Sequence, residues 1–430
     1  MSTLGETLRR LFITLCMLTR TTEWAARRLG AGYFLPALFV LRYASMGGLD
    51  ARKFRNELTG IDSFKDDAWC RYWNALAEAQ MKAAESCVPG FTMDLDGAAA
   101  GAALAPLGAR VATLMNLNST SSSDLKGVAE PAIQALEALR YMIKAITYYQ
   151  VSAFPGNTPR RMAAYHQSAK IFQLVTRIVA PMLGLTIERQ EISVNGERVD
   201  GYLATPLGDQ PCPLVIVTNG LEGTVQELAI PLLRYHDSGF AVFFMEMPGT
   251  YAYRQRMSEA SEAIYHGVID QLSRHPRVDP DRMGFVGVSF GAYWAARMAA
   301  RSPRLKCAVA CGAPTHHSFQ MGNTIGIPDI IVQALLHTTG ATSLHGLMSK
   351  LRSLSLRRLY PQIKIPLLVI NGDNDTLLST RDSVDLAAQA RQGTLKLYPD
   401  DDHCAMAHYN EWLELSQSWM RSHLASDAGR

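Results

Sequence analysis

The second half of the chain contains a serine that could react as a nucleophile. It has a glycine two residues before it and another two residues after it, in the sequence Gly287-Val288-Ser289-Phe290-Gly291. When a G-x-S-x-G sequence joins a strand to a helix, it forms a sharp turn that exposes the serine hydroxyl at the carboxyl edge of a sheet. The apolar run Met283–Val286 precedes this turn, and the helix-forming run Ala292–Ala300 follows it. A side chain on either glycine would clash with neighbouring backbone. The sequence therefore predicts Ser289 as a nucleophile.

Two acidic loops that follow predicted strands offer a base and an orienting acid, in the chain order serine, aspartate, histidine. His403 follows the last predicted strand and is the expected base, with His408 as the alternative. Asp375 lies in the loop after the run Leu367–Ile370 and is the preferred acid. Asp373, the alternative acid, has a competing role in capping that loop. The acid would hold the imidazole tautomer and stabilise the imidazolium formed when the serine loses its proton.

A pair of backbone N–H groups is expected to form an oxyanion hole. One donor should be Phe290, directly after the nucleophile, and the other should lie in the loop after the first central strand. In that loop Gly220 permits a close backbone approach, so we place the second donor at Leu221. Glu222 and Glu227 lie near this loop and either support it or are carboxylates at a solvated or helix N-terminal position.

The elements that must position these residues form an α/β pattern from about residue 186 onward. Two strand-like runs flank Asn195-Gly196, a two-residue hairpin signal. Short apolar runs then alternate with helical segments, which predicts parallel strands covered by helices on both faces. The expected fold is therefore a mostly parallel sheet of about eight strands over residues 186–430, with a helical insertion at about 318–358. The expected strands are Thr186–Val194, Arg198–Ala204, Leu214–Thr218, Ala241–Met245, Met283–Val288, Cys307–Cys311, Leu367–Ile370 and Thr394–Leu397.

Residues 1–185 are predicted to form a separate helical region. Apolar residues recur at three- and four-residue steps after Pro131, and a second helix is expected over about Pro159–Val179. The runs Gly97–Gly101 and Asn118–Ser123 suggest a flexible connection. The segment Leu11–Leu18 is too short to span a bilayer and lacks a signal-cleavage pattern, so we expect a first amphipathic helix there.

Composition excludes several classes of protein. With 48% hydrophobic and 19% charged residues in 430, the chain is not disordered, and a formal charge of +3 gives no reason to expect nucleic acid as a partner. Seven cysteines without a CxxC pair favour a reducing compartment, so a cytoplasmic location is expected. No nucleotide-binding motif occurs, and His316-His317 has no third ligand at helical spacing, so neither an organic cofactor nor a metal is expected.

Taken together, these motifs resemble those of α/β-hydrolases. More narrowly, the chain resembles the group of serine hydrolases that includes fermentation-respiration-switch esterases, 2,6-dihydropseudooxynicotine hydrolase and yellowish-green-type polyketide hydrolases. The resemblance covers about residues 140–420. The group usually has aspartate where Glu222 and Glu246 stand, and glycine where Tyr251 stands, so the pocket is expected to differ. The motifs that carry the resemblance are Asn219-Gly220-Leu221-Glu222 with Glu227, Glu246-Met247-Pro248-Gly249, the serine turn, Gly372-x-x-Asp375, Asp402-His403, Ala145–Tyr149 and Arg161–Tyr165.

The resemblance implies that the helical N-terminal region caps the active site and that the protein forms a homodimer. Tyr148 and Tyr149 would then either reach the pocket from the cap or pack in its core. The expected reaction is hydrolysis of an ester, a thioester or an activated carbon–carbon bond next to a carbonyl, in an apolar substrate of small-molecule size, including polyketide-like and carrier-bound substrates. The alternatives are an acyltransferase or cyclase that uses the same triad, and a non-catalytic binding protein on a hydrolase scaffold.

Overall fold

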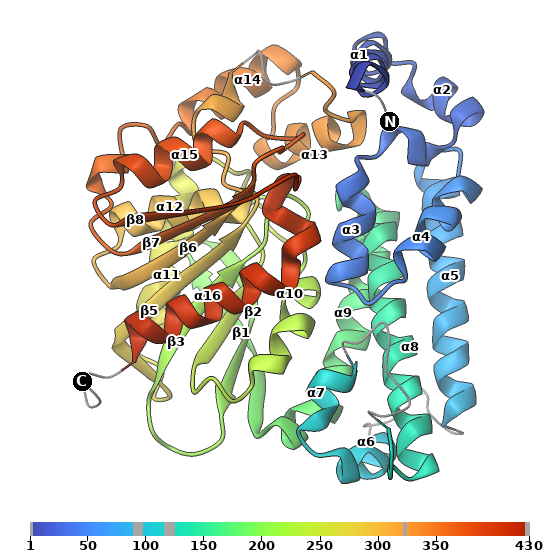
Figure 1. The fold of residues 1–430 in the computed structure, drawn as a ribbon, viewed down its shortest axis with the longest axis vertical. Helices are drawn as coiled ribbons and strands as arrows, with labels where there is room; N and C mark the ends of the chain where they lie inside the picture. The colour runs from blue at the N-terminus through green and yellow to red at the C-terminus, as the bar shows by residue number, and fades with distance from the viewer. Residues whose placement is uncertain (1–2, 89–97, 116–124, 321–324, 426–430) are drawn as a thin grey trace.

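The computed structural model describes residues 3–88, 98–115, 125–320 and 325–425, and within these ranges the chain is helical as far as Leu183. Figure 1 shows these helices side by side with a layered sheet region. Asn118–Ser123 lies outside the described residues, whereas Ala98–Gly101 is helical and corrects the flexible connection expected there. The helices are α1 (Thr3–Thr19), α2 (Thr22–Leu29), α3 (Ala37–Ser45), α4 (Ala51–Glu57), α5 (Asp66–Cys87), α6 (Ala98–Leu104), α7 (Arg110–Met115), α8 (Glu130–Ala153) and α9 (Pro159–Val179).

An eight-stranded sheet begins at Leu185, with the strand order β1-β2-β4-β3-β5-β6-β7-β8. The first two strands form the predicted hairpin, because Asn195 and Gly196 both take the positive φ (51° and 79°) that a tight two-residue turn needs. β2 pairs antiparallel with β4, and every later pair is parallel. The strands are β1 (Leu185–Val194), β2 (Glu197–Pro206), β3 (Cys212–Thr218), β4 (Ala241–Met245), β5 (Val278–Val288), β6 (Leu305–Cys311), β7 (Leu367–Gly372) and β8 (Gly393–Tyr398).

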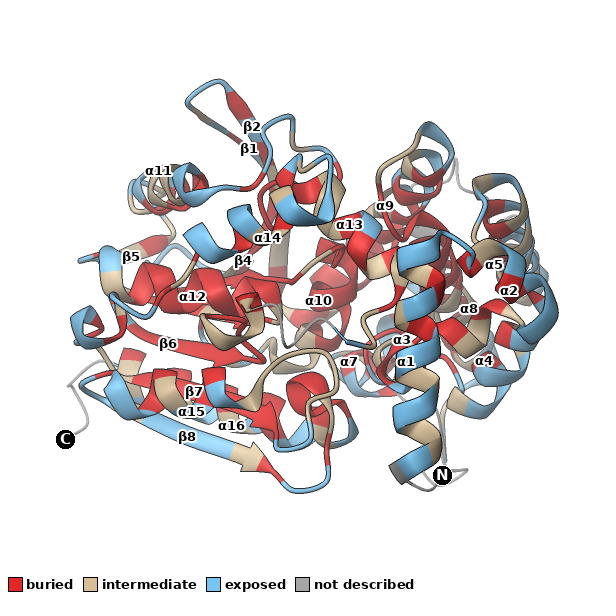
Figure 2. Ribbon diagram, turned by 90° about the horizontal axis from the view of Figure 1, so that it is seen from above, coloured by how far each residue is buried: buried red, intermediate tan, exposed pale blue. Residues whose placement is uncertain are grey.

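Helices cover both faces of this sheet, and the strands alternate between two apolar cores. On β3, Ile216 packs into one core and Val217 into the other, as the two-residue repeat of a strand requires. The first core contains α11 (Glu262–Leu272), α12 (Phe290–Arg301) and α15 (Thr380–Gln389). The second core contains α10 (Val225–Leu232), α16 (Tyr409–Leu424) and the N-terminal helices. Figure 2 shows the buried strands at the centre of the sheet and the exposed edge strand β8.

Two helices lie in the segment between β6 and β7, where an insertion was predicted. They are α13 (Asp329–Thr339) and α14 (Leu344–Ser353), and Figure 1 shows them above the carboxyl end of the sheet, next to α1. Within the described ranges, no helix combines the length and the hydrophobicity needed to cross a bilayer.

Candidate active site

A strained turn holds Ser289 between the end of β5 and the start of α12. Its backbone lies at φ 57° and ψ −126°, and its N–H donates to the Cys311 carbonyl at 2.7 Å. A Cβ on Gly287 would lie 2.1 Å from the Gly291 carbonyl oxygen, and a Cβ on Gly291 would lie 2.4 Å from the Thr218 oxygen. Only glycine fits at both positions, as the sequence predicts.

The structure brings Ser289, His403 and Asp375 into one chain of hydrogen bonds. His403 Nε2 lies 2.9 Å from Ser289 Oγ, and His403 Nδ1 lies 2.8 Å from Asp375 Oδ2. The Asp375 carboxylate is itself fixed, because its Oδ1 accepts the N–H groups of Leu377 and Leu378 at 2.9 and 2.8 Å. Both the imidazole and the carboxylate are almost fully buried. The geometry is that of a nucleophile, a base and an orienting acid.

The two alternative residues have other partners. His408 Nδ1 lies 2.7 Å from Asp401 Oδ2. Asp373 accepts the N–H of Asp400 at 2.8 Å and so closes its loop, which is the capping role considered for it. The structure therefore favours the pair His403 and Asp375.

Burial and nearby charge shift the pKa values of His403 and Asp375 in opposite directions. Burial lowers the pKa of His403, but contact with Cys404 and Asp375 raises it, so the net pKa lies well above its usual value. Burial raises the pKa of Asp375, but the His403 charge and the hydrogen bonds to the carboxylate bring that pKa below its usual range. Cys404 Sγ lies 3.3 Å from His403 Nε2, and burial raises the pKa of this thiol well above its usual value. Because a neutral thiol carries no charge, we attribute the raised histidine pKa to the Asp375 carboxylate.

The predicted oxyanion loop lies directly against the serine turn. A Cβ on Gly220 would lie 2.8 Å from the Phe290 nitrogen and 2.9 Å from Ser289 Oγ, so this loop approaches as closely as a glycine allows. Phe290 is the first residue of α12, where backbone N–H groups have no partner within the helix. Leu221 and Phe290 both line the same cavity as Ser289. These positions suit two donors aimed at a developing oxyanion.

Arg42 of the N-terminal region stabilises the predicted oxyanion loop. No sequence motif indicated this residue. Its guanidinium forms a two-pronged ion pair with Glu227, with N–O distances of 2.5 and 2.6 Å. Glu227 in turn accepts from the Asn219 side chain at 2.9 Å, and the Asn219 oxygen accepts the Gly220 N–H at 2.9 Å. Glu227 is therefore a buried structural carboxylate. Its partner lies 185 residues away in the sequence, so no local pattern could indicate it.

Glu222 follows Leu221 in the same loop and is buried. Its carboxylate accepts the Gly156 N–H at 2.6 Å, its carbonyl accepts the Tyr251 hydroxyl at 2.8 Å, and its φ is 56°. Burial raises the pKa of Glu222 to about 7 and that of neighbouring Glu246 to about 8. Tyr251 stacks on Tyr165 of α9 with ring centroids 4.5 Å apart. Glu222, Glu246 and Tyr251, where this chain differs from the group it resembles, thus connect the N-terminal helices to the oxyanion loop.

An apolar cavity of about 660 Å³ opens above Ser289 and His403. Its walls come from α1, α3 and the end of α8 on one side, and from α13, α14 and the loops of the sheet on the other. Tyr148 and Tyr149 are not among the lining residues, so the pocket role considered for them is wrong. Both pack in the core of the N-terminal region, where the Tyr148 hydroxyl donates to the Glu57 carboxylate at 2.7 Å.

One buried carboxylate shapes the cavity wall after β6. Asp382, at the start of α15, accepts four consecutive backbone N–H groups at 2.7 to 3.1 Å. Those donors are residues 315–318, and Ser318 lines the cavity. His316 and His317, which lie in this loop, contact Ser355 and Asp385 through their rings. No local sequence pattern indicated that Asp382 holds this loop.

Comparisons with known proteins agree with this architecture. A family model described as esterase FrsA-like matches residues 126–425. Esterase FrsA of Vibrio cholerae is 25% identical over 301 residues, covering 68% of this chain and 72% of the relative. The 2,6-dihydropseudooxynicotine hydrolase of Paenarthrobacter nicotinovorans is 26% identical over 282 residues, covering 63% and 72%.

A solved structure of similar fold covers almost the whole chain. The crystal structure of the 2,6-dihydroxy-pseudo-oxynicotine hydrolase aligns with a TM-score of 0.65 at 21% identity, covering 90% of this chain and 95% of the other. The sheet order and the N-terminal helices described above are therefore those of an α/β-hydrolase. With the family model matching most of its length, this chain belongs to the FrsA-like esterase family and is a hydrolase.

Proposed function

We propose that the protein is a serine hydrolase in which Ser289 attacks a substrate carbonyl, His403 acts as the base and Asp375 orients the imidazole. The bond cleaved is that of an ester, a thioester or an activated carbon–carbon bond next to the carbonyl. The observation that carries the proposal is the continuous hydrogen-bonded chain from Ser289 through His403 to Asp375 at the floor of an apolar cavity.

The reaction follows from the positions of these groups. As Ser289 Oγ bonds to the carbonyl carbon, its proton passes to His403 Nε2, and the carbonyl oxygen takes up negative charge facing the N–H groups of Phe290 and Leu221. His403 then gives this proton to the leaving alcohol, thiol or carbanion, which leaves an acyl group on the serine. Water repeats the sequence and releases the acid. A carbanion leaves only if a carbonyl or ring of its own stabilises it.

The cavity wall supports an apolar substrate. Leu38 and Phe39 of α3 and Leu347 and Leu351 of α14 face the cavity, together with Phe290. Such a lining favours an acyl chain or fused rings, including polyketide-like molecules, over a charged substrate, because a charged group would lose its hydration there.

A labelling experiment tests the nucleophile. An activated fluorophosphonate is expected to modify the purified protein at Ser289, as located by mass spectrometry, and p-nitrophenyl esters should be hydrolysed with kcat/KM rising with acyl length. Ser289→Ala should lose both properties, whereas Ser416→Ala, at a buried serine of α16 that donates to the Trp412 carbonyl, should keep them. Absence of labelling and turnover in the folded wild-type protein would support a non-catalytic binding role and refute the proposal.

The apolar lining of the cavity also favours a second candidate reaction, in which an alcohol or amine replaces water as the acceptor. The chain would then be an acyltransferase or cyclase with the same triad. Product analysis by mass spectrometry, with and without an added alcohol or amine, separates the two. Free acid as the product under both conditions identifies the hydrolase.

A further inference from the structure

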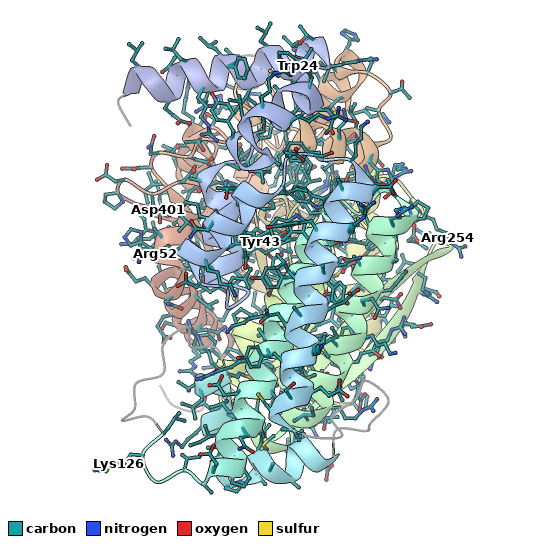
Figure 3. All side chains as sticks on the ribbon, turned by 90° about the vertical axis from the view of Figure 1, so that its right-hand side faces the viewer. Trp24, Tyr43, Arg52, Lys126, Arg254 and Asp401 are labelled. Atoms are coloured by element: carbon teal, nitrogen blue, oxygen red, sulfur yellow. The ribbon has the colours of Figure 1, made fainter. Side chains whose placement is uncertain are left out.

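The mouth of the cavity above Ser289 differs in character from its interior. Leu347 and Leu351 of α14 line the cavity and are buried, so they lie in its interior. Figure 3 shows α1 across the top of the molecule, beside the helices of the insertion. The mouth lies between these elements, because the lining residues that are exposed come from them: Leu18 of α1, and Leu344, His345, Ser349 and Arg352 of α14.

Three polar side chains of α14 lie together at this mouth. His345, Ser349 and Arg352 follow one another at steps of four and three residues, which places them on one face of the helix. All three can donate hydrogen bonds. Among the described residues, no ion pair or side-chain hydrogen bond engages the Arg352 guanidinium. The donors of this arginine are therefore available to a bound molecule.

The positive charge at the mouth has no acid to balance it. The chain between Asp329 and Asp373 contains five lysines and arginines and no aspartate or glutamate, and α14 lies in this segment. No carboxylate belongs to the described lining of the cavity either. The other arginine of that lining, Arg42, is neutralised by Glu227. The mouth therefore attracts negative charge.

We propose that Arg352, together with His345 and Ser349, binds an anionic group of the substrate, a carboxylate or a phosphate, at the mouth of the cavity. The planar guanidinium can donate two parallel hydrogen bonds to the oxygens of either group. The anion keeps part of its hydration at the exposed mouth, whereas the apolar interior would remove it. The substrate class is then an amphipathic acyl compound with its apolar part inside. This inference rests on the proposed function, since it assigns a further part of the substrate of the same site.

Matched substrate pairs measure the preference for a charge. In the first pair, p-nitrophenyl monoesters of linear dicarboxylic acids are compared with neutral p-nitrophenyl esters of the same chain length, which places a carboxylate on the acyl part. In the second pair, octanoyl coenzyme A is compared with the octanoyl thioester of N-acetylcysteamine, which has no phosphate on its leaving group. Wild-type kcat/KM should favour the anionic substrate about tenfold in at least one pair. The pair that responds identifies which part of the substrate carries the anion.

Variants of Arg352 test the residue itself. Arg352→Met should bring the ratio of the anionic to the neutral kcat/KM near unity, and Arg352→Glu should bring it below unity. Arg352 also lies in the last turn of α14, where a cation stabilises the helix end. Arg352→Lys keeps that charge without the two-pronged geometry, so its ratio should lie between those of the wild type and Arg352→Met. The matched control is Arg358→Met, which removes the same charge at an exposed arginine outside the cavity lining and should keep the wild-type ratio.

Failure of this inference is distinguishable from failure of the proposed function. A wild-type protein that hydrolyses the neutral esters without preferring the anionic member of either pair would overturn the anion site alone. An Arg352→Met variant that keeps the preference would also overturn it, as would an Arg358→Met variant that loses the preference to the same extent. No turnover of any of these substrates, with no fluorophosphonate labelling of Ser289, would instead refute the proposed function and with it the substrate class assigned here.

Discussion

Replacing Arg42 by methionine should have two effects: it should destabilise the protein, and it should slow the reaction. The guanidinium neutralises Glu227, whose side chain is 2% exposed, through two short N–O contacts. Without it, the carboxylate keeps the neutral Asn219 amide as its other described side-chain partner and has little access to water. Removing one member of a buried ion pair costs about 3–5 kcal/mol, because the remaining charge stays buried without compensation.

The expected loss of rate comes from the loop that this ion pair supports. Asn219 loses a fixed partner, and the neighbouring Gly220 and Leu221 lose the restraint that holds them against the serine turn. A displaced oxyanion donor lowers kcat by about tenfold to a hundredfold. The double variant Arg42→Met/Glu227→Met removes both charges, so it should regain most of the stability. Its kcat should stay low, because Asn219 still lacks its acceptor.

Urea denaturation and p-nitrophenyl ester turnover measure the two effects separately. The control is Arg160→Met, because the Arg160–Asp67 pair has a similar N–O distance of 2.9 Å but is exposed, and its loss should cost at most about 1 kcal/mol. If Arg42→Met lowered the free energy of unfolding by less than about 1 kcal/mol, or if the double variant were no more stable than the single one, the reasoning would be refuted.

Three further changes have defined outcomes. Asp375→Asn should move the acid limb of the kcat/KM pH profile to lower pH, because the carboxylate raises the pKa of His403 and only the neutral imidazole accepts the serine proton. Gly220→Ala places a Cβ 2.5 Å from the Ser289 Cβ, so steady-state assays should show about a hundredfold loss of kcat. Glu222→Gln should weaken the pH dependence of stability measured by urea denaturation. Burial raises the pKa of Glu222 in the folded protein from its usual value of 4.5 to about 7, so the wild-type protein loses stability as the pH rises between these two values.

Each of these changes has a control. An unshifted acid limb in Asp375→Asn would contradict the cause assigned to the histidine pKa. Gly101→Ala adds a methyl group where nothing lies within 4 Å, so it should leave kcat unchanged and Gly220→Ala should not resemble it. Glu411→Gln replaces an exposed carboxylate and should keep the wild-type pH dependence. Equal slopes for the Glu222→Gln variant and the wild-type protein would count against the buried-acid argument.

The residues that the structure brings together as the sequence predicts are those whose positions follow from local order along the chain. Ser289 was identifiable because its turn needs glycines at fixed positions. His403 and Asp375 followed because the carboxyl ends of parallel strands meet at one edge of a sheet. The eight strands themselves were predicted from short apolar runs and the hairpin signal, and the structure contains all eight. The choice between Asp375 and Asp373 depended on side-chain direction, which spacing alone does not determine.

The residues that the sequence analysis missed act across long separations. Arg42 and Asp382 meet their partners through tertiary packing, and neither has a periodic signal. Tyr148 and Tyr149 lie on a helix whose residues are buried on every side over its second half, so position on the helix could not say which neighbours they face. The first helix was predicted to be amphipathic, but the sequence did not indicate that Ile13 and Cys16 would be buried while the leucines of this helix stay exposed.

The four backbone bonds to Asp382 have a consequence for how this enzyme could acquire new substrates. One carboxylate on α15 fixes the wall at residues 315–318 through their backbone N–H groups, so the path of this wall depends on Asp382, and a change at that residue would displace the whole wall. α13 and α14 form the opposite rim, and no strand of the sheet depends on their side chains for pairing. A directed-evolution library should therefore concentrate its diversity on these two helices, where selectivity can drift while the reactive groups stay in register.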